Sequence, residues 1–213
     1  MLAAELLRPG LLDGVSVLVA HAPPPDGDEP AESFAQAARA SCAELGARVR
    51  ALACGPVVDE ALTNAAVTFA VAELGGRLDM LVVDGPGLFA RGSLTAARTP
   101  GDRAAAALRA CLDVAWDATR AAVNRAFLPA GHGGRIVYLA PGPDAGEHAD
   151  AARAGLENLA RTLSIEWARH SITTATVVPG GDGSAGEAAA LTAYLASPAG
   201  AYFSGSLFDL RGI

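Results

Sequence analysis

The chain has 213 residues, 51% of them apolar, with a formal net charge of −7 and a pI near 5. This length is sufficient for one sizeable hydrophobic core, so we expect a single domain over residues 1–213. The acidic balance excludes a nucleic-acid partner, because such a protein needs clustered basic side chains to replace the counterions of the phosphates.

The N-terminal residues and the cysteines both indicate in which cellular compartment the protein lies. Charged residues and a proline interrupt the apolar stretch at residues 1–12, so it predicts neither a signal peptide nor a membrane-spanning helix. Cys42, Cys54 and Cys111 lie far apart without metal-type spacing, and we interpret them as buried thiols in a reducing compartment. We therefore expect a cytoplasmic protein that has no membrane partner.

Short β-branched runs alternate along the chain with longer alanine-rich amphipathic stretches. This alternation predicts parallel strands joined by helices, in a doubly wound α/β sheet with helices on both faces. The expected fold is one Rossmann-like domain with a seven-stranded, mainly parallel sheet. Strands are assigned at residues 15–20, 48–53, 80–83, 135–139, 173–178 and 206–210, and helices at 31–45, 60–74, 101–116, 117–127, 150–169 and 186–195.

Several segments resemble the short-chain dehydrogenase/reductase family, most clearly in the C-terminal half. Residues 153–167 (Arg-Ala-Gly-Leu-Glu-Asn-Leu-Ala-Arg-Thr-Leu-Ser-Ile-Glu-Trp) look like the long helix that begins at the family's catalytic lysine. Residues 177–180 (Val-Val-Pro-Gly) resemble its strand followed by Pro-Gly, and residues 195–206 its closing helix, turn and strand. The opening and two further strands are matched by residues 11–15, 78–82 and 134–137.

The resemblance implies a dinucleotide site at residues 20–30, the turn after the first strand. In the family this turn is rich in glycine, which lets the backbone approach a pyrophosphate at a helix N-terminus. Here it is Ala-His-Ala-Pro-Pro-Pro-Asp-Gly-Asp-Glu-Pro, with one glycine. Prolines remove N–H donors and the three acidic side chains repel a diphosphate, so the motif is degenerate.

We use the name remnant cleft for the positions that the resemblance places around a cofactor, Ala20, Asp84, Gly85, Pro179 and Gly180. Because the glycine-rich turn has been lost, we expect this chain to bind no cofactor. NAD(P) is instead expected in an active partner.

The catalytic serine, tyrosine and lysine of the family fall on Pro141, Ala149 and Arg153. In the family the tyrosine is the acid or base, and the lysine lowers its pKa by placing positive charge beside the phenolate. This sequence holds no lysine, so no tyrosine can be paired with one elsewhere in the chain. We therefore expect no catalytic residue here, and no metal site.

Other features of this region leave alternatives open. His148 is able to act as an acid or base near neutral pH, or to be a solvated loop residue. Asp144 and Glu147 form a carboxylate site with it or belong to a polar surface loop. Between Gly180 and the last helix only a short stretch remains, so the substrate lid that the family carries after residue 180 is deleted.

The resemblance also implies two subunit interfaces. In the family, the long helices before and after the central strand pack against another subunit, and the last helix and strand form a second contact. The same side chains would also suit the chain's own core or its sheet edge. The candidates are Trp116, Leu156, Leu163, Trp167, Tyr202, Phe203 and Phe208.

The leading hypothesis is a noncatalytic subunit that forms a heterodimer or heterotetramer with an intact homologue. The homologue would bind NAD(P) and act on a hydroxyacyl or ketoacyl thioester or a similar alcohol. The alternative is a homo-oligomeric ligand-binding or regulatory protein with a small molecule near Asp84 and Pro141. A third hypothesis is a diverged oxidoreductase that uses His148 or Arg153.

Overall fold

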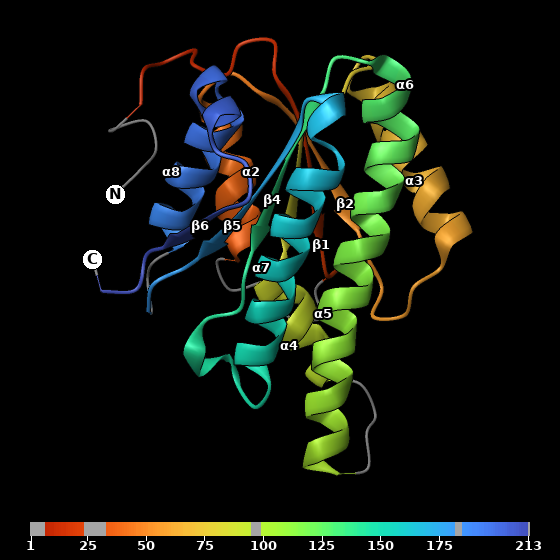
Figure 1. The fold of residues 1–213 in the computed structure, drawn as a ribbon, viewed down its shortest axis with the longest axis vertical. Helices are drawn as coiled ribbons and strands as arrows, with labels where there is room; N and C mark the ends of the chain where they lie inside the picture. The colour runs from red at the N-terminus through yellow and green to blue at the C-terminus, as the bar shows by residue number, and fades with distance from the viewer. Residues whose placement is uncertain (1–6, 24–32, 95–98, 182–184, 213) are drawn as a thin grey trace.

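The strands of the computed structural model, which describes residues 7–23, 33–94, 99–181 and 185–212, run parallel in one sheet (Figure 1). Their order is β2-β1-β3-β4-β5-β6, so the chain begins in the interior of the sheet and changes direction after β2. The strands are β1 (Ser16–His21), β2 (Arg48–Ala53), β3 (Met80–Asp84), β4 (Gly134–Leu139), β5 (Ile172–Val178) and β6 (Ser206–Asp209).

Helices cover both faces of the sheet and are, in chain order, α2 (Phe34–Glu44), α3 (Glu60–Glu73), α4 (Gly85–Ser93), α5 (Pro100–Ala122), α6 (Leu128–Ala130), α7 (Ala149–Glu166) and α8 (Ala185–Ala196). Helices α2 and α8 pack together on one face, whereas α3, α5 and α7 lie side by side on the other (Figure 1). Within the described segments, no helix has the length and apolar character needed to cross a bilayer.

Burial on both faces explains the unbroken apolar sequences of β1 and β3. Every residue of β3 is buried, and so is every residue of β1 except His21. In β1, Leu18 faces the cluster under α3, α5 and α7, whereas Val17 and Val19 face the cluster under α2 and α8. Such two-sided burial is typical of central parallel strands, which accounts for the correct assignment of both from the sequence.

In the part of the chain that the structure describes the sheet has six strands, so the prediction of seven is wrong. Between the end of β2 and the start of α3 the chain has only residues 54–59. A crossover to another parallel strand needs a dozen or more residues, so this connection leaves no room for a further strand and helix. As a result β2 is the outermost strand on its side, and four of its six residues are exposed.

Two helical predictions also needed correction. Residues 101–116 and 117–127, expected as two helices, form the single helix α5, which continues into a π-helical turn at Val123–Phe127. No glycine or proline interrupts the chain there, and Asp117 is buried and paired with Arg120 at 2.8 Å within the helix. The short segment α6 then carries the chain toward β4.

Helix α4 was not expected, because Gly85, Pro86 and Gly87 resemble a turn. Asp84 caps this helix by accepting the N–H of Gly87, and Pro86 lies in the first turn, where its missing N–H costs nothing. Gly92 is needed for close packing, since a Cβ there would lie 2.7 Å from the Cα of Ala107 in α5. Tertiary packing therefore overrides the low helix propensity of glycine.

The three cysteines are buried and free, which confirms the prediction of buried thiols. Burial raises the pKa of Cys42, Cys54 and Cys111 to about 12 in each case. These thiols are therefore protonated and shielded near neutral pH.

Asp79 joins the beginnings of three strands. Its side chain is nearly buried, and Oδ2 accepts the backbone N–H of Ser16 at 2.9 Å. Oδ1 accepts Nε of Arg77 at 2.7 Å. The backbone carbonyl of Asp79 accepts the N–H of Arg135 at 2.9 Å, so this residue connects β1, β3 and β4.

Replacement of this carboxylate should destabilise the domain. In Asp79→Ala the buried N–H of Ser16 loses its acceptor, and we expect the free energy of unfolding to fall by about 2 kcal/mol in urea titrations. The control is Asp113→Ala at an exposed position of α5, where a change within about 0.5 kcal/mol is expected. Equal losses in the two variants would contradict this role for Asp79.

Candidate functional site

A crevice opens at the carboxyl ends of β1 and β3, where the chain reverses its direction across the sheet. Such a switch point is the usual ligand position in doubly wound folds. The crevice is a cavity of about 310 Å³ between the N-terminal ends of α2 and α4. It is lined by His21, Ala22, Pro23, Ser33, Gln36, Arg39, Asp84, Gly87, Ala90, Arg91 and Leu94.

Asp84 lies at the back of this crevice and is 2% exposed. Its Oδ1 accepts the N–H of Gly87 in α4 at 3.1 Å. Burial raises the pKa of Asp84 to about 6, although the backbone groups of Gly87 in α4 and Ala35 in α2 act in the opposite direction. One carboxylate thus serves the N-terminal ends of both helices.

Two positive side chains line the crevice. Arg39 comes from α2 and Arg91 from the last turn of α4. The Nε atom of Arg39 is buried and has no hydrogen-bond partner in the described parts of the chain. Burial lowers the pKa of His21, against the hydrogen bond of its ring to the carbonyl of Ala22, and the charge of Arg39 adds to the lowering.

The other residues of the remnant cleft do not line this cavity. Ala20 and Gly85 are buried beside Asp84, Ala20 in β1 and Gly85 at the start of α4. Pro179 and Gly180 follow β5, which is separated from β3 by β4. In the glycine-rich turn, residues 24–30 lie outside the described residues.

The three positions expected for catalytic groups gather near the carboxyl ends of β4 and β5. Pro141 is buried just after β4, and Ala149 is fully buried at the start of α7. Arg153, one turn further along α7, bonds Asp150 through Nη2 at 2.6 Å. Its Nη1 is buried and has no hydrogen-bond partner within the described ranges.

The polar loop before α7 is solvent-exposed. His148 occupies the N-cap position with a left-handed backbone and makes no capping hydrogen bond through its side chain. Asp144 and Glu147 are also exposed. Among the residues that the structure describes, no group of three or more histidine, cysteine, aspartate or glutamate side chains is arranged to hold a metal ion.

The residues predicted for interfaces differ in where they point. Leu156 is buried in the cluster between the sheet and α3, α5 and α7, and Leu163 is also buried, which favours the core interpretation for both. Trp167 is partly buried against the same cluster. Phe203 and Phe208 stack edge to face with their ring centroids 5.3 Å apart and pack on the opposite cluster.

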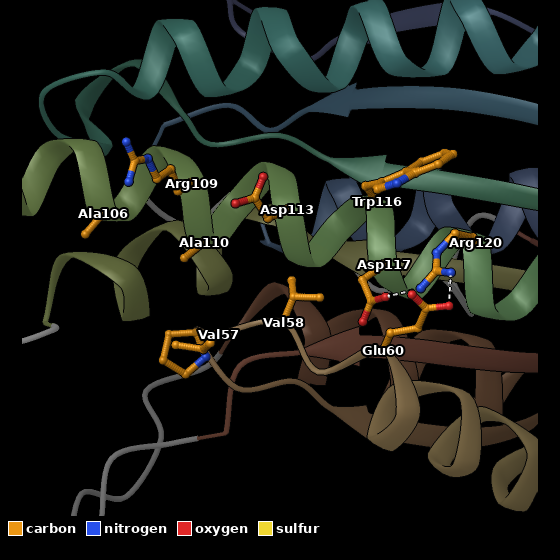
Figure 2. Close-up of a pocket in the computed structure, with 11 residues that line it drawn as sticks. Val57, Val58, Glu60, Ala106, Arg109, Ala110, Asp113, Trp116, Asp117 and Arg120 are labelled. Carbon is orange, nitrogen blue, oxygen red and sulfur yellow. Dashed lines mark hydrogen bonds and ion pairs between the residues drawn. The ribbon is translucent and has the colours of Figure 1, made fainter.

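Trp116 and Tyr202 remain available to a partner, with exposed fractions of 42% and 90%. Trp116 borders a groove of about 920 Å³ between α5 and residues 56–60 (Figure 2). Sequence analysis missed the opposite wall of this groove, where Val57 and Val58 are exposed. Two adjacent valines in the short connection between β2 and α3 were the available signal.

Charged side chains surround the apolar wall of the groove. Figure 2 shows Arg120 of α5 between Asp117 on its own helix and Glu60 of α3, with which it forms ion pairs. Arg109 and Asp113 project from α5 along the same groove. An apolar centre with a charged rim is the usual composition of a protein-binding surface.

Because Asp84 is buried, we expect its contribution to the free energy of unfolding to depend on pH. A pKa raised from 3.8 to about 6 means that the Asp84 contribution is fully favourable below pH 4 and is lost as pH rises through about 6. Asp84→Asn keeps an acceptor for Gly87 without the charge. We expect the variant to gain stability relative to the native chain between pH 4 and 8, by on the order of 2 kcal/mol.

Urea titrations at pH 4.5 and pH 8 measure this gain. Asp59→Asn is the matched control, because Asp59 caps α3 by the same type of hydrogen bond but is exposed. A gain common to both variants, or no gain for Asp84→Asn, would refute the effect of burial.

Comparison with known proteins gives similarity in structure only. No protein-family model matches this chain, and no curated protein matches its sequence significantly. A short-chain dehydrogenase from Mycobacterium smegmatis is 25% identical with a TM-score of 0.72, over 94% of this chain and 93% of that one.

Two further structures have the same arrangement. A hydroxysteroid dehydrogenase from Escherichia coli is 16% identical with a TM-score of 0.71, and carveol dehydrogenase from Mycobacterium avium, in complex with NAD, is 18% identical with a TM-score of 0.73. Each match covers 95% of this chain and 98% of the other. The chain therefore has the Rossmann-like fold of the short-chain dehydrogenases.

Proposed function

We propose that this chain is a noncatalytic subunit that assembles with a catalytically complete short-chain dehydrogenase. The observation that carries the proposal is the position of Asp84 in the crevice. The N-terminal end of α2 is the place where this fold receives a cofactor pyrophosphate. Here a buried carboxylate of the chain itself lines the crevice beside that end of the helix, where the backbone of Ala35 favours its charged form.

Electrostatics supports the absence of a cofactor. A phosphate placed beside Asp84 would meet a carboxylate, and bringing two anions together in a buried crevice is unfavourable. The acidic, proline-rich composition of residues 24–30 acts in the same direction. NAD, which is bound to the similar carveol dehydrogenase, is accordingly assigned to the partner.

The positions expected to be catalytic support the same proposal. Ala149 has no group that can transfer a proton, and Arg153 is paired with Asp150. The resemblance calls for a tyrosine and a lysine at these two positions. The exposed His148 has no base, acid or orienting group bonded to its ring in the described residues, so the diverged-enzyme alternative has little support from geometry.

The outer faces of α5 and α7 are proposed as the surface that contacts the active subunit. Trp116 on α5 and Ile165 on α7 are large apolar side chains that stay exposed, Ile165 to 77%. Gly155 of α7 lets the two helices approach closely, since a Cβ there would lie 2.8 Å from Leu112 of α5. The paired helices therefore form one continuous platform for a heterodimer or heterotetramer.

The partner proposed for this platform is a homologue that acts on a hydroxyacyl or ketoacyl thioester or a similar alcohol or ketone. The similar solved structures, a hydroxysteroid and a carveol dehydrogenase among them, are named for alcohol substrates. That property belongs to those proteins and comes to this chain's partner by analogy.

The proposal is tested on the untagged protein purified from its own cells. Native mass spectrometry should show a stoichiometric complex with a second dehydrogenase, and titration with NADH should show that only the second subunit binds cofactor. Trp116→Glu should break the complex while leaving this chain folded, because it places a charge in the centre of the apolar platform. Leu94→Glu is the matched control, because Leu94 is an exposed apolar residue outside α5 and α7.

A homo-oligomer that itself binds NADH would overturn the proposal and return the diverged oxidoreductase to first place. Equal effects of Trp116→Glu and Leu94→Glu would reject α5 as the contact surface.

A second candidate function is a homo-oligomeric protein that binds a small ligand in the crevice. The observation in its favour is the buried Nε of Arg39, which has no partner in the described residues and lines the cavity together with Arg91. The cavity volume is at the lower end of the range for ligand sites. Retention of a small molecule by the natively purified homo-oligomer, and its loss in Arg39→Met, would favour this candidate.

A further inference from the structure

The outer side of β2 is an open sheet edge. Within the described segments β2 pairs only with β1. Arg48 and Cys54 donate their N–H groups to Val15 and His21 on the β1 side. Because hydrogen-bonding direction alternates along a strand, the N–H and C=O groups of Val49, Ala51 and Ala53 point away from the sheet.

Arg50 protects this edge only in part. Its Nη1 reaches the carbonyl of Val49 at 3.4 Å, and its Nε pairs with Glu73 of α3 at 3.2 Å. Ala51 and Ala53 are exposed and carry no side chain that blocks a partner. An open edge of this kind is a template for another strand.

The helix above the edge also lacks cover. Of the fourteen residues in α3, only Val67 and Ala70 are buried. Leu62 and Phe69 are 68% and 66% exposed. Leu62 lines a hollow together with Leu52 of β2, and Glu73 reaches Arg50, so this side of α3 overhangs the edge. A strand added to β2 would pass under an apolar overhang.

A second copy of the same chain fits this edge in one antiparallel register. Opposed residues must both point outward or both point inward, so Ala51 can face Ala51, Val49 or Ala53 of the copy. With Ala51 opposite Val49, a two-fold axis would pair Arg50 with Arg50, and like charges directly opposite are destabilising. With Ala51 opposite Ala51, Arg50 faces Leu52 and Val49 faces Ala53, and the whole of residues 49–53 is paired.

The register with Ala51 opposite Ala53 is shorter, since its axis passes through Leu52 and brings Gly55 and Pro56 into the pairing. Gly55 and Pro56 lie beyond the end of β2, so only residues 51–53 of each copy are paired within the strand. The charges therefore exclude one register and the sequence length of β2 disfavours the other.

We propose that two copies of this chain associate through β2, antiparallel about a two-fold axis at Ala51, to form a continuous twelve-stranded sheet. The α3 helices of the two copies then lie next to each other on one face of the sheet. Leu62 and Phe69 of each copy are covered by α3 of the other copy. The Arg50 and Glu73 pairs flank the axis, so each charge keeps an opposite charge beside it. This interface lies on a different surface from the α5 and α7 platform.

Cysteine cross-linking tests the register directly. In Ala51→Cys the two introduced residues would be a directly opposed pair with Cα atoms about 5.5 Å apart, within the range of a disulfide. In Ala53→Cys, on the same face of the same strand, the pair would be about 13 Å apart. The native cysteines are buried, so the parent chain contributes no competing thiol.

Under mild oxidation of the full-length chain we expect a covalent dimer from Ala51→Cys at least tenfold faster than from Ala53→Cys. The cross-link should persist in Trp116→Glu, since α5 is not involved. Equal rates for the two cysteine variants, or no dimer from Ala51→Cys, would overturn the proposal.

Light scattering of the noncovalent protein gives a second readout. Ala51→Pro removes an outward N–H while keeping the ladder to β1, and Leu62→Glu charges the overhang. Both variants should have half the molar mass of the parent protein, because the pairing through β2 is lost. Their far-ultraviolet circular dichroism spectra should be the same as that of the parent. The proposed interface would be contradicted if the parent protein did not associate at tens of micromolar. It would also be contradicted if the two variants kept the molar mass of the parent.

Discussion

Burial of β1 and β3 on both faces is the constraint on which the rest of the structure depends. The central parallel strands carry apolar side chains on both faces of the sheet, so helices must cover each face to exclude water. The helices approach closely because small residues stand at their crossings, Gly92 between α4 and α5 and Gly155 between α5 and α7. Asp79 then fixes the start of β3 against β1 and β4.

This arrangement also determines what the carboxyl edge of the sheet can do. The reversal of direction after β2 opens a crevice between α2 and α4, and the buried end of β3 places Asp84 inside it. The Asp84 carboxyl accepts the N–H of Gly87 in α4, and the backbone of Ala35 in α2 also favours its charged form. Burial disfavours that charged form more strongly, so Asp84 contributes most to the stability of the fold when its carboxyl is protonated.

The sequence was sufficient for elements whose residues repeat with a clear period. Strand β1 and helix α7 were placed within one to three residues because their apolar residues follow the periods of a strand and a helix. Helix α4 was not predicted, since its glycines serve contacts with α5 and Leu139 that no local pattern reveals. The number of strands was predicted from the alternation of strand-like and helix-like stretches, whereas the short connection at residues 54–59 leaves no room for a further strand after β2.

The candidate site was less predictable for the same reason. Asp84 was identified as a cleft residue, but its contact with Ala35 joins positions 49 residues apart. The apolar stripe on α7 was too wide to decide which leucines face the sheet, and the structure turns Leu156 and Leu163 inward. Trp116 and Val57 line the same groove, which depends on how α5 passes the end of β2.

The sparse burial of α3 has a consequence for the dynamics of the domain. A helix held by Val67 and Ala70, with Leu74 just beyond its end, can detach locally at small free-energy cost while the central sheet stays intact. Its amide hydrogens should then exchange with solvent through such partial openings rather than through global unfolding. Any molecule that covers α3 from outside would suppress these openings and give the helix the rigidity that its own domain does not supply.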